Sequence, residues 1–114
     1  MLKQTIIDNE FITMWYLPED KILHHQFHTR VIFGDYFRDA LNKGLEILKE
    51  NDACKWLSDD RTNVVFTQED MIWGINNWSI RAIAAGWKYW AVVKPRHMFG
   101  MISFDEFIYD YKQK

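Results

Sequence analysis

Several residue types that carry chemistry are scarce in this sequence. The 114-residue chain has a single cysteine, Cys54, so neither an intrachain disulfide nor a zinc site built on several thiolates is possible. Its five glycines are scattered, which excludes a phosphate-binding loop and a dinucleotide-binding fingerprint. Cys54 opens an apolar run, where a buried structural thiol and a reactive thiol are both conceivable.

Long apolar segments and blocks of like charge are also missing. No stretch approaches the roughly 18 apolar residues of a membrane span, and residues 1–11 lack the apolar core of a signal peptide. The fourteen basic and sixteen acidic residues are interspersed and give a formal charge of −2. Binding to nucleic acid or to an anionic membrane surface needs clustered Lys and Arg. We therefore expect a cytoplasmic protein that binds no nucleic acid and does not insert into membranes.

The composition is that of a folded domain. Hydrophobic residues make up 48% of the chain and aromatic residues 17%. A chain of this length buries roughly 65% of the surface that its unfolded form exposes, which suffices for one core without disulfides or metals. We expect a single domain over residues 1–114.

The first half of the chain is typical of a strand hairpin followed by a helix. β-branched and aromatic residues indicate strands at 4–8 and 11–17, and a turn then leads into a third strand at 21–28. A helix is predicted over 34–52, because its apolar residues recur at helical spacing. Gly44 lies inside this helix. It lowers helix stability by about 1 kcal/mol relative to Ala, and close packing is one reason for it.

The second half alternates between strands and helices. A short apolar strand is predicted at 53–58, and a capping box at Thr67–Asp70 begins a helix that ends at Gly86. The apolar face of this helix is expected to comprise Ile72, Ile75, Trp78, Ala82 and Ile83.

The last strand and helix complete the pattern. Residues 87–94 are the most strand-like run and are expected in the centre of the sheet, and a further capped helix is predicted at 103–111. This order predicts an α/β fold class, with a mixed β-sheet that opens with an antiparallel hairpin and continues in right-handed βαβ units.

The turn after the strand at 53–58 carries the group of residues that most suggests a function. In an open α/β sheet, ligands and partners usually bind at the carboxyl ends of the strands. Asp59, Asp60 and Arg61 could there bind a cation, a polar ligand or the charges of a partner. They could equally pair with each other or with lysines and fix the loop. A catalytic carboxylate pair is a third interpretation, with no other catalytic group recognisable beside it.

The histidines do not assemble a metal site. Consecutive residues of a strand point to opposite faces, which separates His24 from His25, while His24 and His28 lie about 13 Å apart on one face. Zinc needs its histidine nitrogens at about 2 Å. These residues are interpreted as polar positions on a strand. A nucleophilic pair of Cys54 and His97 is conceivable, although no local feature marks the thiol as activated.

Six tryptophans are many for a domain of this size. Trp78 and Trp90 fit core positions, whereas Trp73 and Trp87 flank the second predicted helix and are expected to be buried less easily. Exposed aromatic side chains are typical of an interface or a ligand pocket. Plain core packing is the alternative.

One stretch of the sequence resembles a known family. The run KWLSDDR at 55–61, with RAIAAG at 81–86 and AVV at 91–93, is similar to small bacterial proteins of the STAS/SpoIIAA-like type. STAS domains occur in sulphate transporters and in anti-sigma factor antagonists. The resemblance spans roughly residues 11–110. It implies helices packed largely on one side of the sheet and a non-catalytic regulatory or scaffolding role.

The family pattern differs from this chain at one functional turn. Sigma-regulating antagonists carry a phosphorylated serine in a D-S-S/T-G-like turn after a strand. The corresponding residues 58–62 have a different order and no glycine, so no phosphorylation site is assigned. The family also implies a further strand and helix after Tyr111. An unpaired sheet edge that a second copy completes is a route to a homodimer.

The leading hypothesis is a STAS-like regulatory or protein-interaction module. It would need no cofactor or metal and would act as a homodimer or with a regulatory protein partner. The predicted contact residues lie in the turn after the strand at 53–58 and beside the second helix. They are Ser58, Asp59, Asp60, Arg61, Thr62, Asn63, Trp73 and Trp87.

Two other functions remain open from the residues. A small-ligand carrier would use aromatic side chains and helix faces to line a pocket for an apolar, lipid-like molecule. An enzyme would use Asp59 and Asp60 with a metal ion, although two carboxylates alone make a weak magnesium site.

Overall fold

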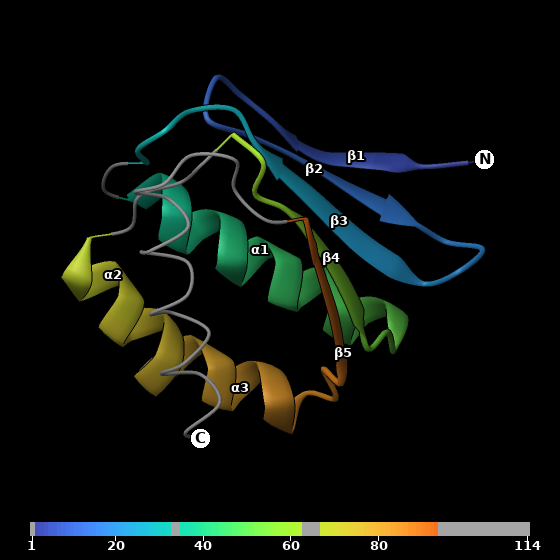
Figure 1. The fold of residues 1–114 in the computed structure, drawn as a ribbon. Coiled ribbons are helices and arrows are strands. Elements are labelled where there is room, and N and C mark those ends of the chain that lie inside the picture. Colours follow the sequence, from blue (N-terminus) through green and yellow to red (C-terminus); the bar gives the residue numbers. More distant parts are fainter. Residues whose placement is uncertain (1, 33–34, 63–66, 94–114) are drawn as a thin grey trace.

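Five strands form one mixed sheet (Figure 1). The computed structural model describes residues 2–32, 35–62 and 67–93. The strands lie in the order β1-β2-β3-β4-β5, with bounds Gln4–Asp8, Ile12–Leu17, Ile22–Phe27, Lys55–Asp59 and Tyr89–Val93. Pairing is antiparallel from β1 to β3 and parallel from β3 to β5. The predicted α/β class, with a hairpin followed by βαβ units, is therefore confirmed.

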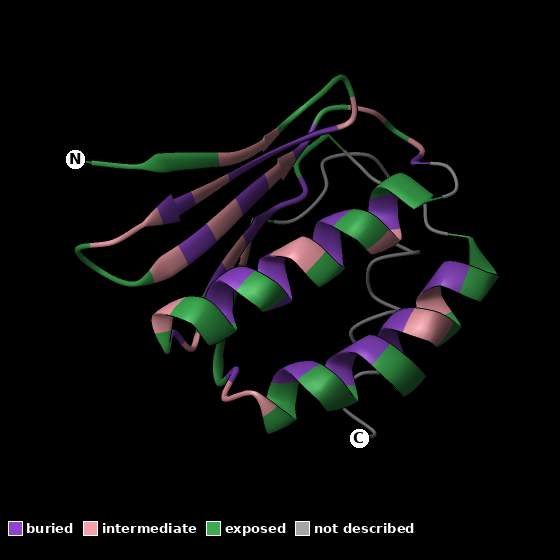
Figure 2. Ribbon diagram, turned by 180° about the vertical axis from the view of Figure 1, so that it is seen from behind, coloured by how far each residue is buried: buried purple, intermediate pink, exposed green. Residues whose placement is uncertain are grey.

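Two helices cover one face of this sheet (Figure 2). The first is α1, Asp35–Asn51. The second runs without a break through α2 (Gln68–Trp73), a π-helical turn η1 (Gly74–Trp78) and α3 (Ser79–Ala84). Both connections between parallel strands thus pass over the same side, as expected for consecutive βαβ units.

The first helix packs on the sheet through one apolar stripe. Phe37, Leu41, Leu45 and Leu48 are all buried, as their helical spacing predicted. Gly44 is the point of closest approach, since a Cβ there would collide with the indole of Trp56 and with Leu23. The expectation of close packing at Gly44 is confirmed.

Tryptophans join the second helix to the sheet. The rings of Trp56, Trp78 and Trp87 pack together with centroids 5.1–6.3 Å apart. The indole N–H of Trp78 donates to the Leu41 carbonyl over 2.8 Å, which also ties this cluster to α1. Trp87 is only 6% exposed, so the expectation that it is poorly buried is wrong.

The second helix begins as predicted but presents a different face. The Thr67 hydroxyl accepts from the backbone N–H of Asp70 and caps the helix, and Gly86 adopts a φ of +108° beyond its end. Ile72 and Ile83, expected on the apolar face, are half exposed. The π-helical turn inserts an extra residue between them, so the 3.6-residue spacing does not hold across it.

Two further sequence predictions change in the structure. The strand predicted at 53–58 is observed at Lys55–Asp59, so Asp59 is the last strand residue rather than part of the loop. The strand at 87–94 was expected in the centre of the sheet, but β5 is the last strand of the described sheet. The central strand is β3, because the antiparallel hairpin and the parallel units extend from it in opposite directions.

The predicted helix at 103–111 lies outside the described residues. Within the described ranges, no helix is long and apolar enough to cross a membrane.

Candidate functional site at the strand ends

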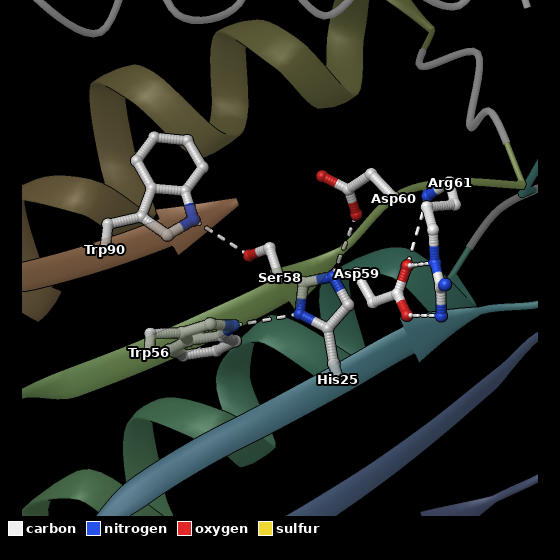
Figure 3. Close-up of polar contacts among 7 residues, drawn as sticks. All are labelled: His25, Trp56, Ser58, Asp59, Asp60, Arg61 and Trp90. Carbon is white, nitrogen blue, oxygen red and sulfur yellow. Dashed lines mark hydrogen bonds and ion pairs between the residues drawn. The ribbon is translucent and has the colours of Figure 1, made fainter. Parts of the chain in front are cut away.

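A polar cluster lies where β3 and β4 end (Figure 3). We call His25, Ser58, Asp59, Asp60 and Arg61 the strand-end cluster. Four of its side chains come from β4 and the residues directly after it, while His25 comes from the paired strand β3, where it lies opposite Ser58. The position agrees with the expectation that function in such a sheet concentrates at the carboxyl ends of its parallel strands.

The two aspartates point to different sides and have different partners (Figure 3). Asp59 accepts a bidentate pair of hydrogen bonds from the Arg61 guanidinium, over 2.9 Å from Nε and 2.6 Å from the terminal nitrogen. Asp60 instead lies 3.2 Å from Nε2 of His25 on the helix-covered side. The carboxylates therefore have separate partners, an arginine and a histidine, and their geometry does not form a shared acid–base pair.

The His25 ring is held by partners at both nitrogens. The indole N–H of Trp56 donates to Nδ1 over 2.8 Å, so Nδ1 carries no proton. Nε2 then carries the proton and donates it toward Asp60. His25 is only 4% exposed, so both bonds form away from water. This arrangement fixes the loop after β4 to the buried core.

Two further hydrogen bonds join the cluster to β5. The Ser58 hydroxyl is buried and accepts from the indole N–H of Trp90 over 2.8 Å. The backbone N–H of Asp60 donates to the carbonyl of Val93 over 2.9 Å. The turn after β4 is thus held by both neighbouring strands.

Charge is distributed unevenly over the cluster. Hydrogen bonding from Arg61 lowers the pKa of Asp59 below its usual value, against the effect of burial, and the same contact raises the pKa of Arg61. The side chain of Arg61 is 46% exposed, whereas that of Asp59 is 8% exposed. The charge that this turn presents to solvent is therefore the guanidinium.

An open depression lies at the amino-terminal ends of the two helices. It has a volume of about 600 Å³ and lies between the first turns of α1 and α2, lined by Asp35, Arg38, Thr67, Gln68, Glu69 and Asp70. Arg38 donates to the buried Asp70 over 2.9 Å and lies 5.2 Å from the ring of Trp73. The lining carries three carboxylates and one guanidinium, so it favours a cationic group.

The remaining predicted contact residues are distributed around the cluster. Thr62 is exposed directly after it. Trp73 is half buried and lies near the guanidinium groups of Arg38 and Arg81, on the side of the depression. Trp87 belongs to the core, and Asn63 lies outside the described residues. The structure therefore groups residues 58–62 at the strand ends and assigns Trp87 to the core rather than to a contact surface.

Sequence reasoning missed the role of His25. It was interpreted as a polar strand residue, but it alternates with Leu23 and Phe27, and all three are buried on the helix-covered side. This alternation along the strand was the sequence signal that could have placed His25 on the buried face. His24 does lie on the opposite face, as predicted, and in the described residues no three His, Cys, Asp or Glu side chains lie close enough to hold a metal ion.

Comparison of the sequence and the structure with models of protein families, with curated proteins and with solved structures finds no match.

Proposed function

We propose that this chain is a regulatory protein-interaction module that binds a partner protein through the surface beside the strand-end cluster. The supporting observation is that the turn after β4 is held on both sides, by His25 of β3 through Asp60 and by the Val93 carbonyl of β5. A turn fixed before binding loses little conformational freedom when a partner docks. Such preorganisation is typical of a recognition surface.

The contact surface is narrower than the sequence suggested. Ser58, Asp59 and Asp60 are buried and serve to fix the turn. The exposed side chains are Arg61, Thr62 and the first turn of α2. We therefore assign recognition to these residues and to the depression between α1 and α2, where Asp35 and Glu69 would attract a Lys or Arg side chain of the partner.

The order of elements supports the regulatory role. A hairpin followed by βαβ units, with the helices on one face, is the architecture that the STAS/SpoIIAA-like resemblance implies. The charged lining of the depression favours a polar contact over the alternative of an apolar, lipid-like ligand.

Charge reversal at the depression tests the proposal. The tagged protein is used to capture binding proteins from its native cells, and captured contacts are mapped by crosslinking mass spectrometry. Glu69→Lys places a cation in the lining and should reduce recovery of the partner at least tenfold. Glu50→Lys makes the same charge change at an exposed position of α1 and should recover the partner as well as the unchanged protein does.

Either of two outcomes would refute the proposal. One is that Glu69→Lys recovers the same protein in the same amount as Glu50→Lys. The other is that crosslinks from the captured protein do not reach Arg61, Thr62 or the first turn of α2. Thermal melting of both variants confirms that each is folded before capture.

A further inference from the structure

The sheet has a second face, which no helix of the described chain covers (Figure 1). Alternate residues of each strand point to this side, because successive side chains of a strand lie on opposite faces. Strand pairing places Trp15, His24, Leu57 and Ala91 in one row across four strands. A second row contains Leu17, Ile22, Lys55 and Tyr89. A third row contains Thr13, Gln26, Asp59 and Val93, and β1 adds Thr5 and Asp8 beside these rows. We call these rows together the helix-free face.

The first two rows of the helix-free face are more apolar than a water-facing sheet surface usually is. In sheets with one solvent-exposed face, apolar residues point inward and polar residues point outward in alternation. Parallel strands are normally covered on both faces. Here Leu57 lies at the centre of the parallel strands and is only half buried, while Tyr89 and Val93 are 62% and 37% exposed. Exposed apolar side chains grouped in this way, beside a polar third row, mark an interaction site.

The centre of this face is electrically neutral. His24 packs on Trp15 with ring centroids 4.9 Å apart. Burial, with the neighbouring His25 as a second cause, lowers the pKa of His24, so the ring is uncharged at neutral pH. Its neutrality removes a charge that would oppose apolar contact there.

Charges at the margin of the face nearly balance. Lys3 lies over the ring of Trp15 at 4.4 Å, and Asp59 is paired with Arg61. With Lys55 of the second row and Asp8 of β1, these groups comprise three cations and two anions. A polyanion such as nucleic acid needs a surplus of positive charge, whereas a second copy of the same face meets little net repulsion.

We propose that two copies of this chain associate through their helix-free faces. Five strands spaced about 4.8 Å apart, each about 17 Å long, give a patch that buries on the order of 1,000 Å² in total when two copies pack face to face, the lower limit of a specific interface. Face-to-face packing of two sheets about 10 Å apart is a standard arrangement. Closed two-fold pairs are also the commonest assemblies of identical chains.

Sedimentation velocity of the full chain, from low micromolar to near-millimolar concentration, measures this association. We expect a reversible monomer–dimer equilibrium, because the buried area is at the small end of the range. Tyr89→Glu and Leu57→Glu place a carboxylate on the face and should leave only monomer over the same concentrations. Tyr89 is exposed, so its variant should keep the native circular dichroism spectrum even if Leu57→Glu lowers stability.

A matched control separates this face from the rest of the surface. Tyr36→Glu makes the same change at a tyrosine that is 49% exposed on α1, and this variant should still dimerise. Glu69→Lys should also dimerise, so failure of the partner-binding proposal leaves this one intact. The inference is overturned by a chain that stays monomeric at every concentration, by an open-ended series of oligomers, or by a dimer that survives in folded Leu57→Glu.

Discussion

At the scale of single residues, burial and partners separate two aspartates that look equivalent in the sequence. Asp59 is paired with a half-exposed guanidinium, whereas Asp60 is paired with a histidine that is itself buried. Loss of the aspartate leaves its partner in water in the first case and in the core in the second. The two side chains therefore contribute differently to stability.

Truncation of these aspartates should show this difference. Asp60→Ala leaves the Nε2 proton of His25 without its acceptor in the core and should lower the free energy of unfolding by about 1–3 kcal/mol. Asp59→Ala leaves a guanidinium that water can solvate, and should lower it by about 1 kcal/mol or less. Urea denaturation at neutral pH measures both values.

Asp39→Ala is the control for these variants, because Asp39 is exposed on α1 and its truncation should change stability by less than about 0.5 kcal/mol. Equal losses from Asp59→Ala and Asp60→Ala would contradict the assignment of Asp60 as the buried anchor of the turn.

Stability should also fall as the solution is acidified from pH 7. The pKa of His24 in the folded protein is lowered from its usual 6.5, mainly by burial, so the unfolded chain takes up this proton more readily. The contribution of His24 to the free energy of unfolding is therefore fully present above pH 6.5. It is lost as the pH falls below that value. Urea denaturation between pH 7 and pH 5 measures the slope.

The variant His24→Gln should have a smaller slope in this interval, since it removes the titrating group. The contribution of Asp59 to stability changes over a separate, more acidic pH range. Its pKa is lowered from 3.8 by hydrogen bonding from Arg61, so its stabilisation is present above pH 3.8 and lost only as the pH falls through the lowered value. An unchanged slope in His24→Gln would show that His24 does not titrate differently on folding.

At the scale of elements, the contact between α1 and the sheet is set by a missing side chain. Gly44 allows the helix backbone to approach the rings of Trp56 and the side chain of Leu23. The second helix joins the same region through Trp78, whose indole bonds to the backbone of α1. A change in the spacing between α1 and β4 is therefore transmitted to the tryptophan cluster.

Gly44→Ala tests this close approach. Alanine improves helix propensity by about 1 kcal/mol, but its Cβ has no room, and overpacking of a core lowers stability by about 1–3 kcal/mol. We expect a net loss of stability with a shift in tryptophan fluorescence. Glu46→Ala, at an exposed position of the same helix, should leave both nearly unchanged. A more stable Gly44→Ala protein would show that the helix can move away without loss.

At the scale of the whole molecule, the sheet is organised around β3. This strand pairs with β2 on one side and β4 on the other, and its buried residues Leu23, His25 and Phe27 face the helices. Strand β1 pairs only with β2 among the described strands and contains a shift in register between Thr5 and Ile7. Local opening should therefore begin at β1.

Native-state hydrogen exchange can measure this order of opening. Amides of β3 should exchange by global unfolding, whereas amides of β1 should exchange at least tenfold faster through local opening. A dimer formed through the helix-free face covers β1 together with the other four strands, so raising the protein concentration should slow the exchange of the β1 amides. Equal protection of β1 and β3 would contradict this description of the sheet.

The sequence by itself determined much of this architecture. Local signals sufficed for the strand positions, for the extent of α1 and for the Thr67 cap, because each depends on neighbouring residues. The tertiary structure alone decided the edge position of β5 and the burial of Trp87, since both depend on strands and helices far apart in the chain. It also decided that Asp60 meets His25, 35 residues away. No local pattern specifies such a pair, because chain folding and burial alone bring its two members together.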